Sequence, residues 1–162
     1  DLGGTTGTLG MQEERSVFSG VDAKQKVAPA VCYESVYGDF MTGYMDNGAN
    51  FIAIITNDGW WGETPGYKQH LAYARLRAIE TRKSIVRSAN TGVSCFINQR
   101  GDILQAQPYW QEAAIEGEIK LNSERTIYSY TGDLFGLSAC FLAIWLYIWS
   151  FYLRFKQRRN KA

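Results

Sequence analysis

The feature that most constrains this chain is an uncharged apolar stretch near its C-terminus. Residues 134–153, LFGLSACFLAIWLYIWSFYL, contain no charged side chain. An α-helix of about 20 residues crosses the roughly 30 Å hydrocarbon core of a membrane. A buried helix of a soluble protein is the alternative, but such a helix is usually polar on one face. We therefore predict a transmembrane helix over residues 134–153.

Charge is distributed unevenly on the two sides of this stretch. Five of the 17 basic residues lie in residues 154–162, which leaves residues 1–133 with four more acidic than basic side chains. Nucleic-acid-binding domains carry a basic face, so we expect no nucleic-acid partner. Basic residues beside a membrane span tend to stay cytoplasmic. We therefore predict a cytoplasmic tail at residues 154–162 and a body, residues 1–133, on the outer side of the membrane.

The cysteines and the histidine indicate no metal site. The three cysteines, at positions 32, 95 and 140, have no CxxC spacing, and an odd number does not favour a disulfide framework. The single histidine, His70, has no ligand-type side chain at a suitable spacing on its own helix face. We interpret His70 as a structural histidine and expect neither a metal nor a cofactor.

Residues 1–133 alternate between strand and helix patterns. Residues 1–10, DLGGTTGTLG, are typical of a loop, and residues 99–102, QRGD, of a hairpin turn. Buried β-branched runs predict strands, and apolar residues at helical spacing predict helices. The predicted strands are residues 16–19, 26–33, 49–58, 84–90, 93–98 and 113–121, and the predicted helices are residues 35–48 and 67–83. This order predicts an α/β fold with a layered sandwich.

Cys32, in the segment VAPAVCYESVYGDF, lies where a predicted strand gives way to a helix. Backbone N–H groups at the start of a helix stabilise negative charge, which can activate a thiol and hold an oxyanion. Cysteine is also among the most commonly buried residues, so packing is the alternative role. Glu34 lies two residues further on, where it could contact a substrate amine or a leaving group.

A second strand end carries polar and aromatic residues. Asn57 and Asp58 end the strand at residues 49–58, and Trp60 and Trp61 follow in the loop NDGWWG. Sites in parallel α/β sheets form beyond the carboxyl ends of the strands. We therefore predict that these four residues contact substrate beside Cys32. For the tryptophans, the alternative is that they only cover the core.

Several segments together resemble the C-terminal half of the apolipoprotein N-acyltransferase family, which are membrane enzymes with a nitrilase-like (carbon–nitrogen hydrolase) domain. The similar segments keep the family's order: GGTTGT, VAPAVCYESVYGDF, IITNDGWWG, QHLAYARLRAIETRKSIVRSANTGVS and TIYSYTGDLFG. The resemblance implies an α/β fold, part of a nitrilase-like αββα sandwich, followed by one C-terminal transmembrane helix. It also implies a bacterial inner membrane location with the catalytic domain on the periplasmic side.

The resemblance further implies acyl transfer by Cys32. Its thiolate would take a fatty acyl chain from a phospholipid donor as a thioester, and the α-amino group of a diacylglyceryl-modified apolipoprotein would then accept the chain. Thiol nucleophiles suit such chemistry because they divide one transfer into two easier steps. Glu34 matches the family's supporting glutamate, the backbone N–H of Tyr33 would serve as an oxyanion donor, and Trp60 matches a tryptophan that helps receive substrate.

The chain departs from the family's pattern in its catalytic triad. The family pairs its cysteine with a glutamate base and a lysine that both lie upstream in other strands. Lys24 and Lys26 lie too close to Cys32, and Glu13 and Glu14 lie in the wrong segment. We therefore expect the two partners, and any targeting segment, to precede Asp1, and we expect this fragment to be inactive alone.

Two other functions remain open at this point. A nitrilase-type amidase tethered by one helix would use the same cysteine on small amides. A catalytically inactive module would use the Trp60–Trp61 loop to bind a lipid or a peptide.

Overall fold

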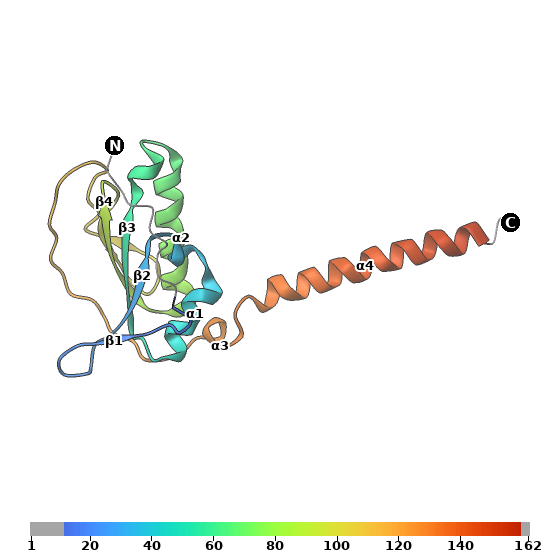
Figure 1. Ribbon diagram of the computed structural model, residues 1–162, viewed down its shortest axis with the longest axis horizontal. Helices are drawn as coiled ribbons and strands as arrows, with labels where there is room; N and C mark the ends of the chain where they lie inside the picture. Colours follow the sequence, from blue (N-terminus) through green and yellow to red (C-terminus); the bar gives the residue numbers. More distant parts are fainter. Residues whose placement is uncertain (1–11, 160–162) are drawn as a thin grey trace.

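The computed structural model describes residues 12–159 (Figure 1). The Gly/Thr loop predicted within residues 1–10 lies outside the described residues, as do residues 160–162 of the tail. The strands are β1 (Phe18–Ser19), β2 (Lys26–Val31), β3 (Phe51–Asn57), β4 (Ser84–Asn90), β5 (Cys95–Ile97) and β6 (Ile103–Leu104). The helices are the 3₁₀ turns η1 (Cys32–Val36) and η2 (Asp58–Trp61), and the α-helices α1 (Gly38–Asp46), α2 (Pro65–Thr81), α3 (Ile127–Thr131) and α4 (Leu134–Arg159).

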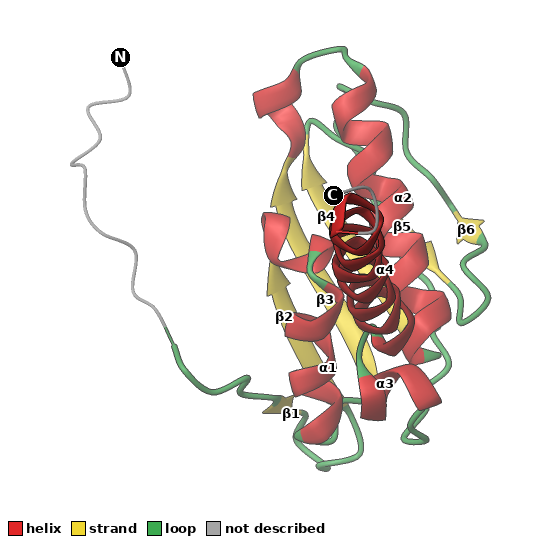
Figure 2. Cartoon of the chain, turned by 90° about the vertical axis from the view of Figure 1, so that its right-hand side faces the viewer, coloured by secondary structure: helices red, strands yellow, loops and turns green. Residues whose placement is uncertain are grey.

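The strands form one sheet in the order β1-β2-β3-β4-β5-β6. The central strands β2, β3 and β4 are parallel, while β1, β5 and β6 join antiparallel at the edges. The parallel strands are joined by α1 and by α2, which cover the same face of the sheet (Figure 2). The predicted α/β fold is confirmed, and its strands alternate with helices in the predicted order.

One face of the sheet forms the core with these helices. Ala28 and Ala30 of β2, and Ile52 and Ile54 of β3, are buried and alternate along their strands, as the two-residue period of a strand requires. Small alanines on β2 leave room for Met41 and Tyr44 of α1, which are also buried. The opposite face is more open, and Val31 and Ile55 there are 58% and 61% exposed.

The register of the central strands aligns their carboxyl ends. Val31 pairs with Ile55, Thr56 pairs with Ala89, and Asn57 pairs with Asn90. The turns η1 and η2 therefore leave the sheet side by side at one edge. Ligands of open α/β sheets bind at this kind of edge, beyond the carboxyl ends of parallel strands.

The strand predicted at residues 113–121 is wrong. This stretch is extended but belongs to no sheet, and the strand that follows the 99–102 turn is instead the short β6. Side chains from the sheet bind the backbone of the stretch: Ser84 Oγ donates to the carbonyl of Lys120 at 2.8 Å. Gly117 lies against the ring of Phe96, where a Cβ would come within 2.9 Å of the ring. The alternating pattern therefore reflects packing of a single extended segment against β5.

Buried Lys83 fixes the end of this segment. Its Nζ donates to the carbonyl of Glu124 at 2.6 Å, and the residue is 1% exposed. Burial lowers the pKa of Lys83 to about 8 from an ordinary value of 10.5, and the nearby charge of Arg125 adds to this effect.

The last helix, α4, begins at Leu134, where the predicted span begins. Within Leu134–Gln157, an 18-residue window has a mean hydropathy of 1.9 and contains no buried residue, so α4 is not a core helix of the domain. Figure 1 shows α4 projecting away from the sheet and its covering helices. Asp133, just before α4, donates its backbone N–H to Asp39 Oδ1 of α1 at 3.3 Å. The apolar helix is thus tied to the helix that follows Cys32.

The titration of Lys83 predicts a pH dependence of stability. Between about pH 8 and 10.5 the unfolded chain binds a proton at Lys83 that the folded chain releases, so the free energy of unfolding rises with pH across this window. In detergent, the Tm of the wild-type chain should rise relative to that of Lys83→Met by roughly 2–8 °C over the window, as measured by circular dichroism. Parallel pH profiles of Tm for the two proteins would contradict this.

Candidate active site

Cys32 lies in a strained turn directly after β2. Its φ of +51° is in the left-handed region, which is unfavourable for residues other than glycine. Backbone strain of this kind, of the order of 1–3 kcal/mol, is common at functional sites and persists only where the surroundings hold it. The thiol is partly exposed, and Thr56 Oγ1 of β3 lies 3.3 Å from its Sγ. The strand-end position predicted for Cys32 is thus confirmed, and its conformation marks the turn as a special one.

A hydrogen-bonded network beneath the turn holds this conformation. Ser35 Oγ donates to the carbonyl of Cys32 at 2.9 Å, and His70 Nε2 lies 3.2 Å from the same oxygen. Ser35 Oγ and His70 Nε2 are also 3.1 Å apart. His70 is 2% exposed and hydrogen-bonded at both ring nitrogens, as expected for a structural histidine. Its contacts further show that it supports the backbone of the candidate nucleophile.

Asp58 is the charged centre of this network. His70 Nδ1 lies 3.1 Å from its Oδ1, and Arg87 Nη2 of β4 donates to Oδ1 and Oδ2 at 3.0 and 2.8 Å. Burial alone would raise the pKa of Asp58, but the hydrogen bonds and charges of His70 and Arg87 outweigh it and hold this pKa below its ordinary value. The carboxylate therefore stays ionised, and through His70 and Arg87 it links α2 to β4.

The turn between β4 and β5 closes over this carboxylate. A Cβ at Gly92 would lie 2.0 Å from Asp58 Oδ2, so only glycine allows so close an approach. Asp58 itself is 0% exposed. We predicted from the sequence that Asp58 contacts substrate, but in the structure its carboxylate is enclosed, and its contacts position the residues around Cys32.

The other predicted residues lie around the turn on its outer side. Glu34 Oε2 accepts a hydrogen bond from the backbone N–H of Val31 at 2.7 Å, which fastens the turn to the end of β2. The ring of Tyr33 is about half exposed and lies 6.3 Å from the ring of Trp61. Trp61 also packs on His70, with ring centroids 5.3 Å apart, so it covers the buried network.

Asn57 and Trp60 face outward from the same edge. Asn57 Oδ1 accepts from Gly59 N at 3.1 Å and lies 3.5 Å from Asn90 Nδ2 of β4. Trp60 is 81% exposed and is available for contact with another molecule. The sequence-based prediction therefore placed these residues at the correct strand end. It did not distinguish the buried Asp58 and the covering Trp61 from the exposed Trp60.

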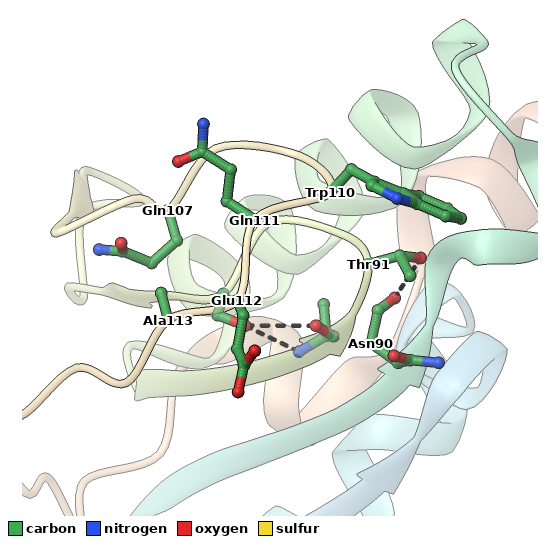
Figure 3. Close-up of a pocket in the computed structure, with 9 residues that line it drawn as sticks. Asn90, Thr91, Gln107, Trp110, Gln111, Glu112 and Ala113 are labelled. Carbon is green, nitrogen blue, oxygen red and sulfur yellow. Dashed lines mark hydrogen bonds between the residues drawn. The ribbon is translucent and has the colours of Figure 1, made fainter.

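A pocket of about 310 Å³ opens at the end of β4, beside this edge (Figure 3). One wall is the turn after β4, with Asn90 and Thr91, and the other is residues 107–113. The walls are joined by a hydrogen bond from Trp110 N to the carbonyl of Thr91 at 2.8 Å. Trp110 and Thr91 both have positive φ, 62° and 59°. Figure 3 shows the indole of Trp110 beside Thr91. Asn90 connects the pocket to Asn57.

Sequence reasoning missed Thr56, Ser35 and Arg87. Thr56 was part of a predicted strand, and only the structure shows that its hydroxyl, on the buried face of β3, lies beside Cys32 Sγ. Arg87 interrupts a buried strand, which is a signal because a buried charge needs a partner.

The described residues contain no cluster of three or more His, Cys, Asp or Glu side chains that could hold a metal ion. The lysines near Cys32 in sequence lie elsewhere in space. Lys26 begins β2, a strand of six residues, which places it about 20 Å along the sheet from Cys32.

Comparison with protein families agrees with this arrangement of strands and turns. Residues 5–128 match the carbon–nitrogen hydrolase family. This chain belongs to the carbon–nitrogen hydrolase family. The match covers η1, η2 and the whole network around Asp58.

Curated relatives of this chain are apolipoprotein N-acyltransferases. The chain is 38% identical over 109 residues to that of Chlorobaculum tepidum, a match that covers 67% of this chain and 20% of the relative. It is 33% identical over 123 residues to that of Haemophilus influenzae, covering 75% of this chain and 24% of the relative. These matches confirm the resemblance found in the sequence. The chain spans about a fifth to a quarter of the length of these relatives.

Solved structures of the family share the fold. An amidase from Nesterenkonia sp. superposes with a TM-score of 0.53 at 14% identity, over 64% of this chain and 40% of the amidase. A carbon–nitrogen hydrolase from Helicobacter pylori superposes with a TM-score of 0.50 at 14% identity, over 54% of this chain and 38% of that hydrolase. This likeness confirms the predicted nitrilase-like fold and says nothing about substrate.

The network predicts a large effect of changing Asp58. Asp58→Asn would leave buried Arg87 without a charged partner, so the free energy of unfolding should fall by about 3–5 kcal/mol. Denaturant unfolding of the chain in detergent measures this.

The matched control is Asp102→Asn. Asp102 pairs with Arg100 at 3.2 Å on the surface, with side chains 52% and 79% exposed. Loss of such an exposed pair should cost about 1 kcal/mol or less. Equal losses for the two variants would show that the Asp58 network does not hold the site together.

Proposed function

We propose that this chain is the cysteine-bearing part of an apolipoprotein N-acyltransferase. The enzyme would move a fatty acyl chain from a phospholipid to the α-amino group of the diacylglyceryl-modified N-terminal cysteine of a lipoprotein. The observation that carries the proposal is the placement of Cys32, in a left-handed turn at the carboxyl edge of the parallel strands with a hydroxyl beside its sulfur. The similarity to N-acyltransferases over 67% of the chain supports this choice of reaction.

In the first step, the thiolate of Cys32 attacks the ester carbonyl of a phospholipid. A bond forms between Sγ and the acyl carbon, the ester C–O bond breaks, and the lysophospholipid leaves with the proton that a general base had removed from the thiol. The backbone N–H of Tyr33 lies in the first turn of η1, where N–H groups have no partner within the helix, and it would bind the oxyanion. Glu34, fastened to Val31 N, keeps this N–H in place.

In the second step, the lipoprotein amine attacks the thioester. The new amide bond forms as the bond between the acyl carbon and Sγ breaks, and the thiolate returns. The amine must lose a proton, which calls for a general base. A glutamate base and a lysine, carried outside residues 12–159, would complete the site, because Lys24 and Lys26 lie at the far end of β2.

The outer residues suit lipid and peptide substrates. Trp60 is exposed at the edge next to Cys32, and an exposed aromatic side chain in a loop is a favourable contact for an acyl chain or a membrane surface. Asn57 offers amide groups to the polar part of a substrate. Trp61 would extend the apolar wall on the other side of the turn, while Asp58 supports the site from below.

The apolar helix α4 would hold this site at its lipid substrate. Leu134–Gln157 is long enough to cross a membrane, and the basic residues at its end favour a cytoplasmic C-terminus. The catalytic domain would then lie on the periplasmic side of the bacterial inner membrane. A diacylglyceryl-modified lipoprotein is anchored in the same bilayer, so both substrates would reach Cys32 by diffusion in the membrane.

The proposal predicts a covalent intermediate on Cys32. The protein in which this chain is joined to its upstream part, incubated with phospholipid, should gain the mass of a fatty acyl group on the peptide that contains Cys32. Mass spectrometry under acidic conditions, which preserve thioesters, detects the adduct. In Cys32→Ser the adduct and turnover should both be lost, with a fall in rate of roughly 10³-fold or more, because hydroxyls are much weaker nucleophiles at neutral pH.

The controls and the other outcomes separate the alternatives. Cys95 is buried, and burial raises its pKa to about 11, so Cys95→Ser should retain the adduct on Cys32. Hydrolysis of simple amides without an acyl adduct would favour a tethered amidase. Equal activity of wild type and Cys32→Ser would remove Cys32 from the mechanism. The 162-residue chain alone should form no adduct.

A further inference from the structure

The side chain of Thr56 lies between the candidate nucleophile and the buried carboxylate. Thr56 Oγ1 is 3.3 Å from Cys32 Sγ and 3.2 Å from Asp58 Oδ1, and the residue is 5% exposed. A hydroxyl has one proton, so it can donate to only one of these two acceptors at a time. Within residues 12–159, Thr56 is the only residue whose side chain lies within hydrogen-bonding distance of Cys32 Sγ.

The groups around Thr56 determine whether its hydrogen bond stabilises Cys32 Sγ or Asp58 Oδ1 more. Asp58 from η2 is already bound by Arg87 from β4 and His70 from α2, so it does not depend on the Thr56 proton. Glu34 from η1 binds Val31 N and does not compete for Thr56. In the described part of the chain, no other side chain donates to the sulfur. A hydrogen bond to an ionised acceptor is about twice as strong as a neutral one, and both Asp58 and a Cys32 thiolate are ionised. Because Asp58 already accepts hydrogen bonds from Arg87, the proton of Thr56 stabilises the thiolate more than it stabilises Asp58.

We propose that Thr56 is a positioning residue that stabilises the thiolate of Cys32 by a hydrogen bond. This hydrogen bond breaks when the thioester forms and re-forms when the thioester is cleaved in acyl transfer. This inference rests on the proposed function of Cys32. The register of β2 and β3 places Thr56 one position beyond the Val31–Ile55 pair, and the left-handed turn brings Sγ back over it. The strained conformation of Cys32 therefore directs its sulfur to this hydroxyl.

The Thr56 hydroxyl changes its hydrogen-bond acceptor as the charge on Sγ changes during acyl transfer, and it stays protonated throughout. It donates to Sγ while the sulfur is a thiolate. When Sγ bonds to the acyl carbon, the sulfur becomes a poor acceptor, and rotation about one side-chain bond turns the proton to Asp58 Oδ1. When the amine attacks and the S–C bond breaks, the leaving thiolate receives the same hydrogen bond again. Asp58 thus accepts the hydrogen bond of Thr56 while Sγ carries the acyl group.

The test is the pH profile of alkylation of Cys32, read by mass spectrometry of its peptide. Wild type, Thr56→Val and Thr56→Ser are treated with iodoacetamide as full chains in detergent. Valine has the shape of threonine without the hydroxyl, so the midpoint pH of Cys32 alkylation should rise by roughly one pH unit, a tenfold loss of thiolate at a fixed pH below the midpoint. Thr56→Ser keeps the hydroxyl and should keep the wild-type midpoint.

The matched control is Thr81→Val, which removes another buried threonine hydroxyl, one that donates to the carbonyl of Arg77 in α2. Its midpoint should equal that of wild type even if its Tm falls. If Thr56→Val does not fold, Thr56→Ala makes the same test. Equal midpoints for wild type and the folded variant that lacks the hydroxyl would overturn the proposal. Alkylation needs no lipid, so a shifted midpoint without an acyl adduct would refute the proposed acyl transfer and leave standing only the stabilisation of the Cys32 thiolate by Thr56.

Discussion

The pairing of Asp58 with Arg87 and His70 is the interaction on which the rest of this structure depends. A carboxylate that is 0% exposed costs several kcal/mol to desolvate unless charged and hydrogen-bonding partners surround it. Here the partners come from β4 and α2, while the carboxylate lies in η2 after β3. The charge therefore fixes three elements relative to one another at one edge of the sheet. Through His70 and Ser35, it also fixes the carbonyl of Cys32.

This arrangement explains how a strained turn can persist at Cys32. The left-handed conformation is unfavourable by itself, but the network binds the Cys32 carbonyl from below, and Glu34 binds the strand end. Cys32 remains partly exposed above the network, Trp60 of the neighbouring turn η2 is exposed, and the ring of Tyr33 is half-exposed. Rigid support beneath a reactive group holds it in the geometry that a reaction requires.

The sequence predicted most of the fold, because its signals were local. Residues 26–31 and 51–57 are apolar runs with one buried face, and the helix predicted over residues 67–83 is α2, which begins two residues earlier at Pro65. The prediction of a strand over residues 113–121 was wrong because apolar and polar residues also alternate in a single segment that packs on a sheet. The site was predicted in part: Cys32 and the NDGWWG loop belong to adjacent strand ends. The roles of Thr56, Ser35 and Arg87 depend on strand register and on the path of α2, which no local pattern contains.

The helix α1, which follows Cys32 and η1 along the chain, also contacts the residue that precedes the apolar helix α4. The backbone of Asp133, immediately before α4, binds Asp39 in the first turn of α1, seven residues after Cys32. The position of α4 is therefore coupled through α1 to the turn of Cys32.

Transfer of an acyl group from Cys32 to an amine is the central claim, and a single-turnover experiment tests it most directly. The protein carrying this chain and its upstream part is first loaded with a labelled acyl group on Cys32 and freed of phospholipid. It is then mixed with a diacylglyceryl-cysteinyl peptide. The account predicts that the label leaves Cys32 and appears as an amide on the N-terminus of the peptide. Release of the label as free fatty acid, at a rate independent of the peptide, would contradict it.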